Sequence, residues 1–198
     1  MICALVLAAG RSRRMGVQKL LLPVQGQPLI AHVADQVLRS PVDHVFVIVG
    51  HDADQLAQAL AGRNVSLVDN PELDGEMLSS VRCGLRALPA ACDAVLVALG
   101  DQPGITAELI ARLVQAFRHG GKGIVLPAHG GQRGHPLVFT TRYRDEILTG
   151  YDHVGLHGLL RAHGDDVDEV EVGEPSVLED LDRPEDYQRL VGQGTAKE

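Results

Sequence analysis

Aromatic side chains are scarce in this sequence: they make up 3% of the residues, and tryptophan is absent. A core without large rings must be filled by valine, leucine, isoleucine and alanine, which dominate the hydrophobic 45% of the chain. Charged residues make up 22%, a share typical of folded globular proteins, so the composition argues against a disordered chain. The length of 198 residues suits one domain with a single buried core.

Cysteine is also rare, and Cys3, Cys83 and Cys92 form no CxxC pair and leave an odd count. This pattern argues against a disulfide framework and a zinc site, and it indicates reduced thiols in a cytoplasmic protein. No run approaches the roughly 20 apolar residues that a membrane helix needs. Residues 2–9 are apolar, but the run is short and its arginines follow it, so a signal peptide is not expected.

A block of basic residues is missing as well. The chain has 18 lysines and arginines against 26 aspartates and glutamates, which gives a formal net charge of −8. Such a charge repels polyanions, and the basic residues are spread along the chain, so no nucleic-acid partner is expected. Small phosphorylated ligands remain compatible with this charge, because a few basic residues in one loop suffice to bind them.

Short apolar runs alternate along the chain with segments of helical periodicity. The runs are typical of strands buried on both faces; among the helices, one is opened by Pro28 and one is capped by Thr106. This alternation predicts an α/β fold, with a mostly parallel sheet between two layers of helices. We expect one domain over residues 1–191 and a frayed tail over 192–198. The expected strands are 3–7, 44–49, 65–68, 94–99, 123–126 and 167–172, and the expected helices are 29–38, 56–60, 78–88, 107–117, 154–163 and 184–191.

A glycine-containing loop, residues 7–19, directly follows the first expected strand. Ligands of open α/β sheets bind at the carboxyl ends of strands, and glycines let the backbone turn its N–H groups towards an anion. The positive charge of the loop suits the negative charge of a nucleoside triphosphate. Its basic residues are Arg11, Arg13, Arg14 and Lys19.

The loop fits neither of two common phosphate-binding motifs. A P-loop has four residues between its glycines and a lysine directly after the second, whereas five residues separate Gly10 from Gly16 and Lys19 is not adjacent. The dinucleotide fingerprint G-x-G-x-x-G fails because positions 12 and 13 are not glycine. The loop is therefore either a phosphate site of another design or a solvated basic segment.

Acidic residues occur at two places where a metal ion could meet such a loop. Asp101 follows the expected strand 94–99, and Asp180 and Asp182 precede the last expected helix. Mg²⁺ prefers carboxylate and phosphate oxygens, so each of these residues is a candidate ligand. The structural alternatives are an ordinary turn after the strand and a helix N-cap at Asp182.

The loop resembles the signature L-A-[AG]-G-x-S-x-R-M-G-x-x-K of a nucleotidyltransferase family that includes the sugar-phosphate nucleotidylyltransferases. Every fixed position of the signature is met in residues 7–19. Residues 100–103 resemble the family's metal-binding G-D-x-P motif, and residues 180–186 resemble its D-[IL]-D-T-P-E-D segment. Arg183 stands where threonine is usual, which should matter little if the carboxylates bind the metal.

The resemblance implies a three-layer α/β/α, Rossmann-like fold of the nucleotide-diphospho-sugar transferase type. It implies catalytic roles for Arg14, Lys19 and Asp101. A Mg²⁺ cofactor would be held by Asp101 together with Asp182 or Asp180, and Asp182 is favoured. The implied nucleotide-binding residues are Leu7, Ala8, Ala9, Gly10, Arg11, Ser12, Arg14, Lys19, Asn70, Pro71, Ser79, Ser80 and Gly100.

Within the family the sequence is most similar to the molybdenum cofactor nucleotidyltransferases, and Ala9, where the guanosine-using branch has glycine, favours the cytidine-using branch. The implied reaction transfers CMP from CTP to the phosphate of molybdopterin and releases pyrophosphate, and a molybdoenzyme would receive the product. Gly134 and His135 resemble the acceptor-binding G-H-P-x-x-F segment. His157, however, stands where arginine is usual, which leaves two alternatives open: another phosphorylated acceptor such as methylerythritol phosphate or a sugar phosphate, or a non-catalytic accessory protein that binds the molybdenum cofactor.

Overall fold

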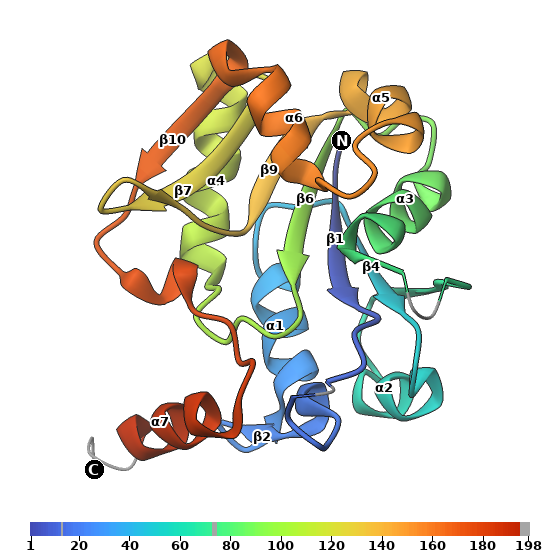
Figure 1. Cartoon of the computed structure of the whole chain (residues 1–198), viewed down its shortest axis with the longest axis vertical. Helices are drawn as coiled ribbons and strands as arrows, with labels where there is room; N and C mark the ends of the chain where they lie inside the picture. Colours follow the sequence, from blue (N-terminus) through green and yellow to red (C-terminus); the bar gives the residue numbers. More distant parts are fainter. Residues whose placement is uncertain (13, 73–74, 195–198) are drawn as a thin grey trace.

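The computed structural model describes residues 1–12, 14–72 and 75–194. Its centre is an eight-stranded sheet in the order β10-β7-β9-β6-β1-β4-β5, with β8 paired to β7 (Figure 1). Strands β8 and β9 run antiparallel to their neighbours, and the remaining strand pairs of this sheet are parallel. The strands of the sheet are β1 Ile2–Ala8, β4 His44–Val49, β5 Ser66–Asp69, β6 Ala94–Leu99, β7 Ile124–His129, β8 Gln132–Arg133, β9 Leu137–Thr140 and β10 Val167–Glu171.

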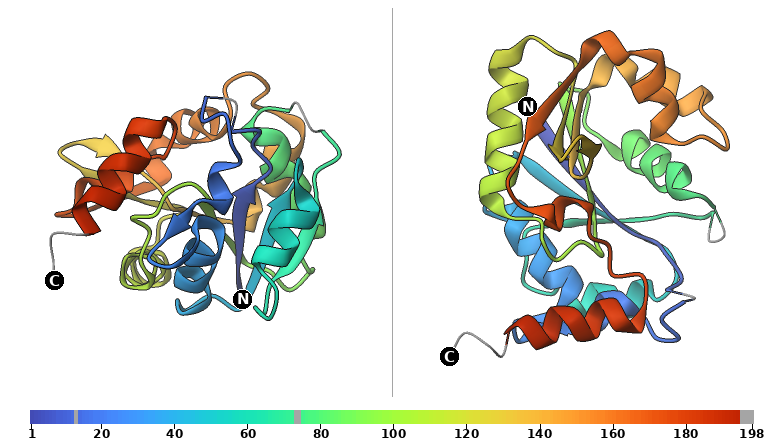
Figure 2. Two further views of the ribbon diagram at one scale, coloured as in Figure 1. Left: turned by 90° about the horizontal axis from the view of Figure 1, so that it is seen from below. Right: turned by 60° about the vertical axis from the view of Figure 1, so that its left-hand side comes forward.

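Helices cover both faces of the sheet, which confirms the expected three-layer α/β/α fold (Figure 2). Alternate residues of β1 enter two separate cores: Ala4 and Val6 pack on the side of α1 and α4, and Cys3 and Leu5 pack on the side of α3 and α6. The helices are α1 Leu29–Leu38, α2 Ala53–Ala59, α3 Met77–Ala87, α4 Ala107–Gly120, α5 Arg144–Thr149, α6 Leu156–Ala162 and α7 Pro184–Gly194. Smaller elements are the hairpin β2 Pro23–Val24 with β3 Gln27–Pro28 and the 3-10 turns η1 Lys19–Leu21, η2 Thr141–Tyr143, η3 Gly164–Asp166 and η4 Pro175–Leu178.

Some local expectations are wrong. β5 lies at the sheet edge with β4 as its neighbour, so it is largely exposed and not buried on both faces. Pro28 is not the first helical residue; its extended backbone (ψ 141°) places it in the hairpin just before α1. No element is expected between residues 127 and 153, but the structure places β8, β9 and α5 there. The last helix extends three residues past its expected end to Gly194, and residues 195–198 of the expected tail lie outside the described chain.

The expected helix cap at Thr106 is confirmed. Its Oγ1 accepts a hydrogen bond of 3.1 Å from the backbone N–H of Leu109, in the first turn of α4. Thr106→Ala is expected to lower the free energy of unfolding by about 1 kcal/mol, because that N–H loses its partner. Urea unfolding monitored by circular dichroism measures this change, and an unchanged midpoint would show that water replaces the cap fully.

The order of the strands places a crevice at the carboxyl ends of β1 and β6. From β1 the chain proceeds through β4 to β5 on one side of the sheet, and it then returns to form β6 on the other side of β1. Loops that leave two such strands diverge, which is where open α/β sheets bind ligands. Among the described helices, none is long and apolar enough to span a bilayer.

Two later segments reach the same edge. Because β9 is antiparallel to β6, with Leu137 opposite Val97, the residues just before β9 lie beside the carboxyl end of β6. After β10 the chain crosses this edge towards α7 (Figure 1). There the N–H of Leu181 donates to the carbonyl of Asp101 at 3.0 Å. Residues 134–135 and 180–182 are thereby brought to the end of β6.

Candidate functional site

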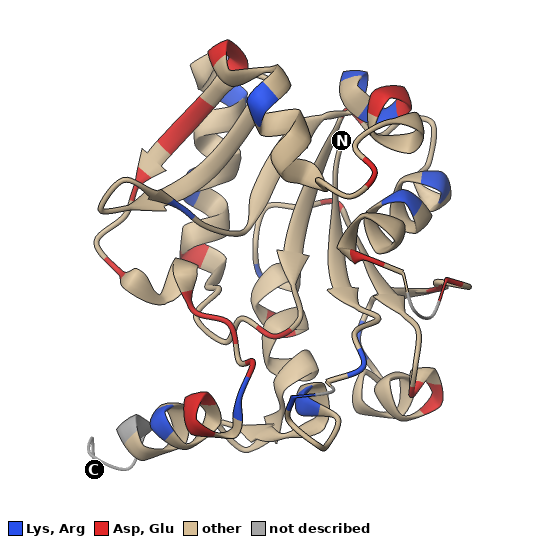
Figure 3. Cartoon of the chain, viewed as in Figure 1, with Lys and Arg blue, Asp and Glu red and all other residues tan. Residues whose placement is uncertain are grey.

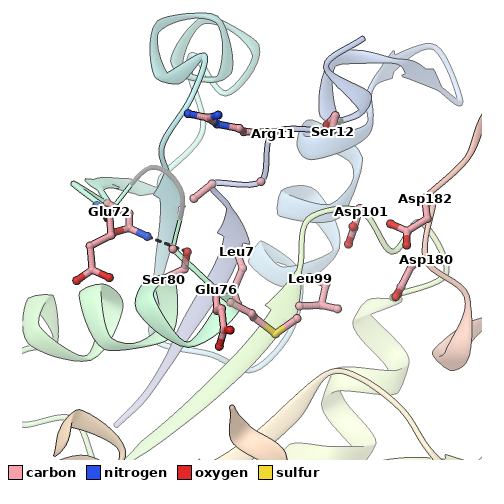
Figure 4. A pocket seen from close by; sticks show the side chains of 15 residues that line it. Leu7, Arg11, Ser12, Glu72, Glu76, Ser80, Leu99, Asp101, Asp180 and Asp182 are labelled. Atoms are coloured by element: carbon pink, nitrogen blue, oxygen red, sulfur yellow. Dashed lines mark hydrogen bonds between the residues drawn. The ribbon is translucent and has the colours of Figure 1, made fainter. Parts of the chain in front are cut away.

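A cavity of about 500 Å³ lies at the carboxyl ends of β1 and β6. Figure 4 shows acidic side chains of the C-terminal segment on one side of it and the start of α3 on the other. Ten of the residues expected to bind nucleotide or metal on sequence grounds appear in its wall, together with five that the sequence did not single out. The lining residues are Leu7, Ala9, Gly10, Arg11, Ser12, Asn70, Glu72, Gly75, Glu76, Met77, Ser80, Leu99, Asp101, Asp180 and Asp182.

The loop after β1 is folded back on itself through Ser12. This residue has a positive φ of 49°, and its Oγ donates to Oε1 of Gln18 at 2.9 Å and accepts from the N–H of Lys19 at 3.1 Å. A second turn is made at Gly16, whose φ of 71° suits glycine. These bonds fix the position of Lys19 behind the cavity wall, where its ammonium contacts Asp101 and Asp182. Arg13, the fourth basic residue of the loop, lies outside the described residues.

The ammonium group of Lys19 joins two carboxylates from distant parts of the chain. Its Nζ lies 2.6 Å from Oδ2 of Asp101 and 3.0 Å from Oδ1 of Asp182, and Arg14 Nη1 lies 2.8 Å from the other oxygen of Asp182. Burial lowers the pKa of Lys19, but Asp101 and Asp182 outweigh it, so the pKa is raised. The hydrogen bond from Lys19 lowers the pKa of Asp182. Lys19 and Asp182 therefore stay ionised, and Figure 3 shows basic and acidic residues on neighbouring ribbon segments at this end of the sheet.

Gly100 allows the loops after β1 and β6 to approach each other. Its N–H donates to the carbonyl of Leu7 at 3.0 Å. A Cβ atom at this position would lie 2.9 Å from that oxygen and 3.1 Å from Cδ1 of Ile30. Any side chain would therefore push the Asp101 loop away from the glycine loop.

The donor set of the site fits a hard divalent cation. Asp101 and Asp182 already converge on one positive charge, the ammonium of Lys19, and two carboxylates completed by substrate phosphates are a usual environment for Mg²⁺. Across the described part of the chain, no set of three or more histidine, cysteine, aspartate and glutamate side chains is arranged to hold a metal by itself. A metal here would therefore take part of its coordination from substrate.

Asp180 has a different environment from Asp182. Its Oδ1 accepts a hydrogen bond of 2.6 Å from Nε2 of the buried Gln102, and burial raises its pKa. Its charge also faces those of Asp101 and Asp182, which raise the pKa further. Gln102 was not singled out from the sequence; its signal is its position between Asp101 and Pro103 in the turn that ends β6. Asp180 is thus engaged by Gln102, whereas Asp182 and Asp101 face the same ammonium, which makes Asp182 the better candidate ligand.

The opposite wall is organised by Asn70, which is buried after β5. Its Nδ2 donates to the hydroxyls of Ser79 and Ser80, at 3.0 and 3.1 Å, and its Oδ1 accepts from the N–H of Glu72 at 3.0 Å. Ser80 lines the cavity, whereas Ser79 and the exposed Pro71 do not. Of the remaining sequence candidates, Ala8, Arg14, Lys19 and Gly100 are also absent from the lining, although Lys19 and Arg14 contact it through Asp182.

A second cavity, of about 280 Å³, adjoins the first. The two share Glu76 and Met77, at the start of α3, and the second contains Gly134 and His135, as the sequence predicts for an acceptor site. Burial lowers the pKa of His135, and the nearby His157 lowers it further, so its imidazole is mostly neutral at pH 7. The remaining lining residues of the second cavity are Leu78, Leu126, Arg133, Leu137, His153, Val154, Gly155, Leu156, His157 and Leu160.

The sequence did not single out the residues shared by the two cavities or the apolar wall of the second. Glu76 and Met77 lie at a helix N-terminus after a strand, a position that often faces a ligand, and this was their available signal. The leucines of the second cavity carry no such signal. Leu126 on β7 and Leu137 on β9 are also buried core residues, so their sequence character gives no hint of a cavity.

Comparison with known proteins identifies the family of this chain. Residues 4–167, most of the chain, match the model of the MobA-like NTP transferase domain. The bifunctional protein GlmU of Shouchella clausii is 37% identical over 129 residues, which cover 64% of this chain and 28% of that protein. The chain thus spans little more than a quarter of the length of this curated relative.

Solved structures of similar proteins cover the whole chain. A homologue of Mycobacterium tuberculosis Rv0371c from Mycobacterium sp. strain JC1 is 28% identical with a TM-score of 0.86, and covers 100% of this chain and 98% of its own. A nucleotidyl transferase from Methanothermobacter is 29% identical with a TM-score of 0.85, and covers 100% and 99%. The site geometry, the family match and these structures agree: the chain belongs to the MobA-like NTP transferase domain family and is a nucleotidyltransferase.

Proposed function

We propose that this chain transfers CMP from CTP to the phosphate of molybdopterin, with Mg²⁺ as cofactor and pyrophosphate as the leaving group. The observation that carries the proposal is the pair of adjoining cavities: a polar one beside Lys19, Asp101 and Asp182, and a smaller apolar one that contains His135. One suits a nucleoside triphosphate with its metal. The other, with apolar and polar side chains in its wall, suits an acceptor with a flat ring system that has apolar faces and polar edges.

The residues of the first cavity would act by binding and charge stabilisation. Arg14 and Lys19 would bind the β- and γ-phosphates of CTP, so that negative charge developing on pyrophosphate meets fixed positive charge. Asp101 and Asp182 would hold Mg²⁺, which when bound would neutralise charge on the reacting phosphates. The acceptor phosphate would attack the α-phosphorus in line from the side of the second cavity. No covalent nucleophile on the protein is needed.

The second cavity favours molybdopterin over the polyhydroxylated acceptors that remain as alternatives. Five leucines form much of its wall: Leu78, Leu126, Leu137, Leu156 and Leu160. Burying the hydroxyls of a sugar or of methylerythritol phosphate there without hydrogen-bond partners would cost about 1–3 kcal/mol each. A pterin places its ring faces against apolar walls at no such cost.

Pyrophosphate release measured with each of the four nucleoside triphosphates, with and without molybdopterin, tests the proposal. Release with CTP that requires both molybdopterin and Mg²⁺ is expected. Release with a sugar phosphate or methylerythritol phosphate instead would identify the alternative acceptor. Binding of the cofactor without turnover of any nucleotide would favour a non-catalytic accessory protein. The contacts that join Lys19 to Asp101 and Asp182 argue against that accessory role, since a carrier needs no such charged centre.

His157→Arg is expected to strengthen acceptor binding. The imidazole of His157 lines the acceptor cavity where related sequences have arginine, and a guanidinium is permanently charged and binds phosphate with two hydrogen bonds. The KM for molybdopterin should fall about three- to tenfold, corresponding to roughly 0.7–1.4 kcal/mol, while the KM for CTP stays unchanged. A raised acceptor KM would mean that the cavity is fitted to the smaller imidazole.

A cytoplasmic location and a molybdoenzyme as receiver of the product complete the proposal. CTP is a cytoplasmic metabolite, and Cys3, Cys83 and Cys92 are free thiols in the fold, as expected for a protein kept in a reducing compartment.

A further inference from the structure

The loop between α5 and α6 has an unusual backbone for its sequence. Tyr151 and His153 have positive φ values of 71° and 63°, and Gly155 has a φ of 59°. Positive φ is uncommon for residues other than glycine, and it persists where surrounding contacts impose it. The same loop forms one wall of the acceptor cavity, through His153, Val154 and Gly155. What holds this loop therefore determines the shape of the cavity.

Arg82, on α3, makes the contacts that hold it. Its Nε donates to the carbonyl of Ile147 at 2.9 Å, its Nη2 to the carbonyl of Gly150 at 2.6 Å, and its Nη1 to Oδ1 of Asp152 at 2.7 Å. The hydrogen bond from Arg82 lowers the pKa of Asp152, so this carboxylate stays ionised. The first two acceptors lie at the end of α5, where helical carbonyls lack partners. The planar guanidinium of Arg82 can donate to all three acceptors at once. A lysine ammonium cannot reproduce this arrangement of donors.

The other contacts of the loop are made with the adjoining helices α5 and α6, or they are weak. Tyr151 hydrogen-bonds Glu146 of α5, and its ring packs against Gly158 of α6, where an added Cβ would lie 2.3 Å from Cδ1 of the ring. The pair His153–Glu76 does reach α3, but its atoms lie 3.9 Å apart and both side chains are more than 60% exposed. Exposed pairs of this kind contribute little. Arg82 is thus the main polar tie between the loop and α3.

The same helix carries the wall of the nucleotide cavity. Met77 and Ser80 line that cavity from the first turn of α3, whereas Arg82 lies further along the helix and contacts neither cavity. We propose that Arg82 is a positioning residue for the acceptor: it fixes the 150–155 loop against α3 so that the acceptor cavity keeps its shape next to the bound nucleotide. This inference rests on the proposed two-substrate function, and it assigns Arg82 no contact with either substrate.

Steady-state kinetics and hydrogen exchange on four full-length proteins test this role: wild type, Arg82→Ala, Arg82→Lys and Arg86→Ala. Arg86 is the matched control, because it is an exposed arginine one turn further along the same helix. In Arg82→Ala the KM for molybdopterin should rise about tenfold, with the KM for CTP changed less than twofold. Arg82→Lys should recover only part of the loss, and Arg86→Ala should behave as wild type.

Hydrogen exchange separates this inference from the proposed function. In Arg82→Ala without ligands, peptides covering 147–157 should exchange at least several-fold faster, while peptides of β1 and β6 keep their wild-type rates. If the wild type does not use molybdopterin, the proposed acceptor is wrong, and the exchange rates still decide whether Arg82 holds the loop. Unchanged exchange at 147–157, or an equal rise of both KM values, would overturn the inference. If Arg82→Ala does not fold, Asp152→Ala replaces it. This variant should also raise the KM for molybdopterin and speed exchange at 147–157, but by smaller factors than those expected for Arg82→Ala.

Discussion

Asp101→Asn is expected to reduce Mg²⁺-dependent pyrophosphate release by about 10²–10³-fold, equivalent to roughly 3–4 kcal/mol of transition-state stabilisation. The asparagine keeps the shape of the side chain but removes the charge that faces Lys19 at 2.6 Å and that would bind the metal. CTP should still bind weakly, because Arg14 and Lys19 are retained. Initial rates at several Mg²⁺ concentrations, together with CTP titration calorimetry, measure both effects.

Asp180→Asn is the matched control for this variant. Asp180 lines the same cavity, but it hydrogen-bonds Gln102 and its pKa is raised by burial, so removing its charge should lower the rate less than tenfold. Asp182→Asn should instead resemble Asp101→Asn. Full turnover in Asp101→Asn would remove that residue from the metal site, and a large loss in Asp180→Asn alone would show that Asp180 is the second ligand.

Lys19→Ala is expected to raise the KM for CTP by about 10- to 100-fold, roughly 1.4–2.7 kcal/mol, with a smaller change in kcat. The reason is the loss of a buried positive charge that would otherwise bind the triphosphate. The hydrogen bond from Lys19 also lowers the pKa of Asp182. Without it this carboxylate takes up a proton at higher pH, so CTP binding should fail earlier on acidification than in the wild type.

Lys122→Ala provides the control, because Lys122 bonds only the carbonyl of Asp165 among the described residues, far along the chain from the site. Both variants should be compared at saturating Mg²⁺, which replaces part of the charge lost between Asp101 and Asp182. Thermal unfolding of each variant distinguishes a folding defect from a binding defect. An unchanged KM for CTP in Lys19→Ala would contradict a triphosphate role for this residue.

The fold could be predicted well where a strand is buried on both faces. The strands at 44–49 and 94–99 have the expected bounds, because each largely apolar run is preceded by an aspartate and followed by a glycine. The prediction was wrong where tertiary pairing decides the structure. The four residues of β9 become a strand because they pair with β6 and β7, a contact that their own sequence does not specify. The six-residue α5, with Ile147 as its buried residue, is likewise too short for a periodic signal.

In the candidate site, too, some features could be predicted from local sequence and others depend on tertiary contacts. Lys19 and Asp101 could be paired from sequence, because a loop after one strand and an acid after a neighbouring parallel strand meet at one edge. The sequence favoured Asp182 but left Asp180 open, since the two differ in burial and partners and not in sequence pattern. Arg82 gave no signal either, because its acceptors are mostly backbone carbonyls of a loop more than sixty positions away.

The reversed direction of β9 also bears on how such a protein can evolve. Loops at the functional edge normally follow parallel strands, but β9 contributes the loop that precedes it, carrying Gly134 and His135. The cavity proposed for the nucleotide is lined largely by residues 7–101, and the cavity proposed for the acceptor is lined largely by residues 126–160. The second segment can therefore accumulate substitutions and insertions that change the acceptor while the chemistry of nucleotide activation is inherited intact.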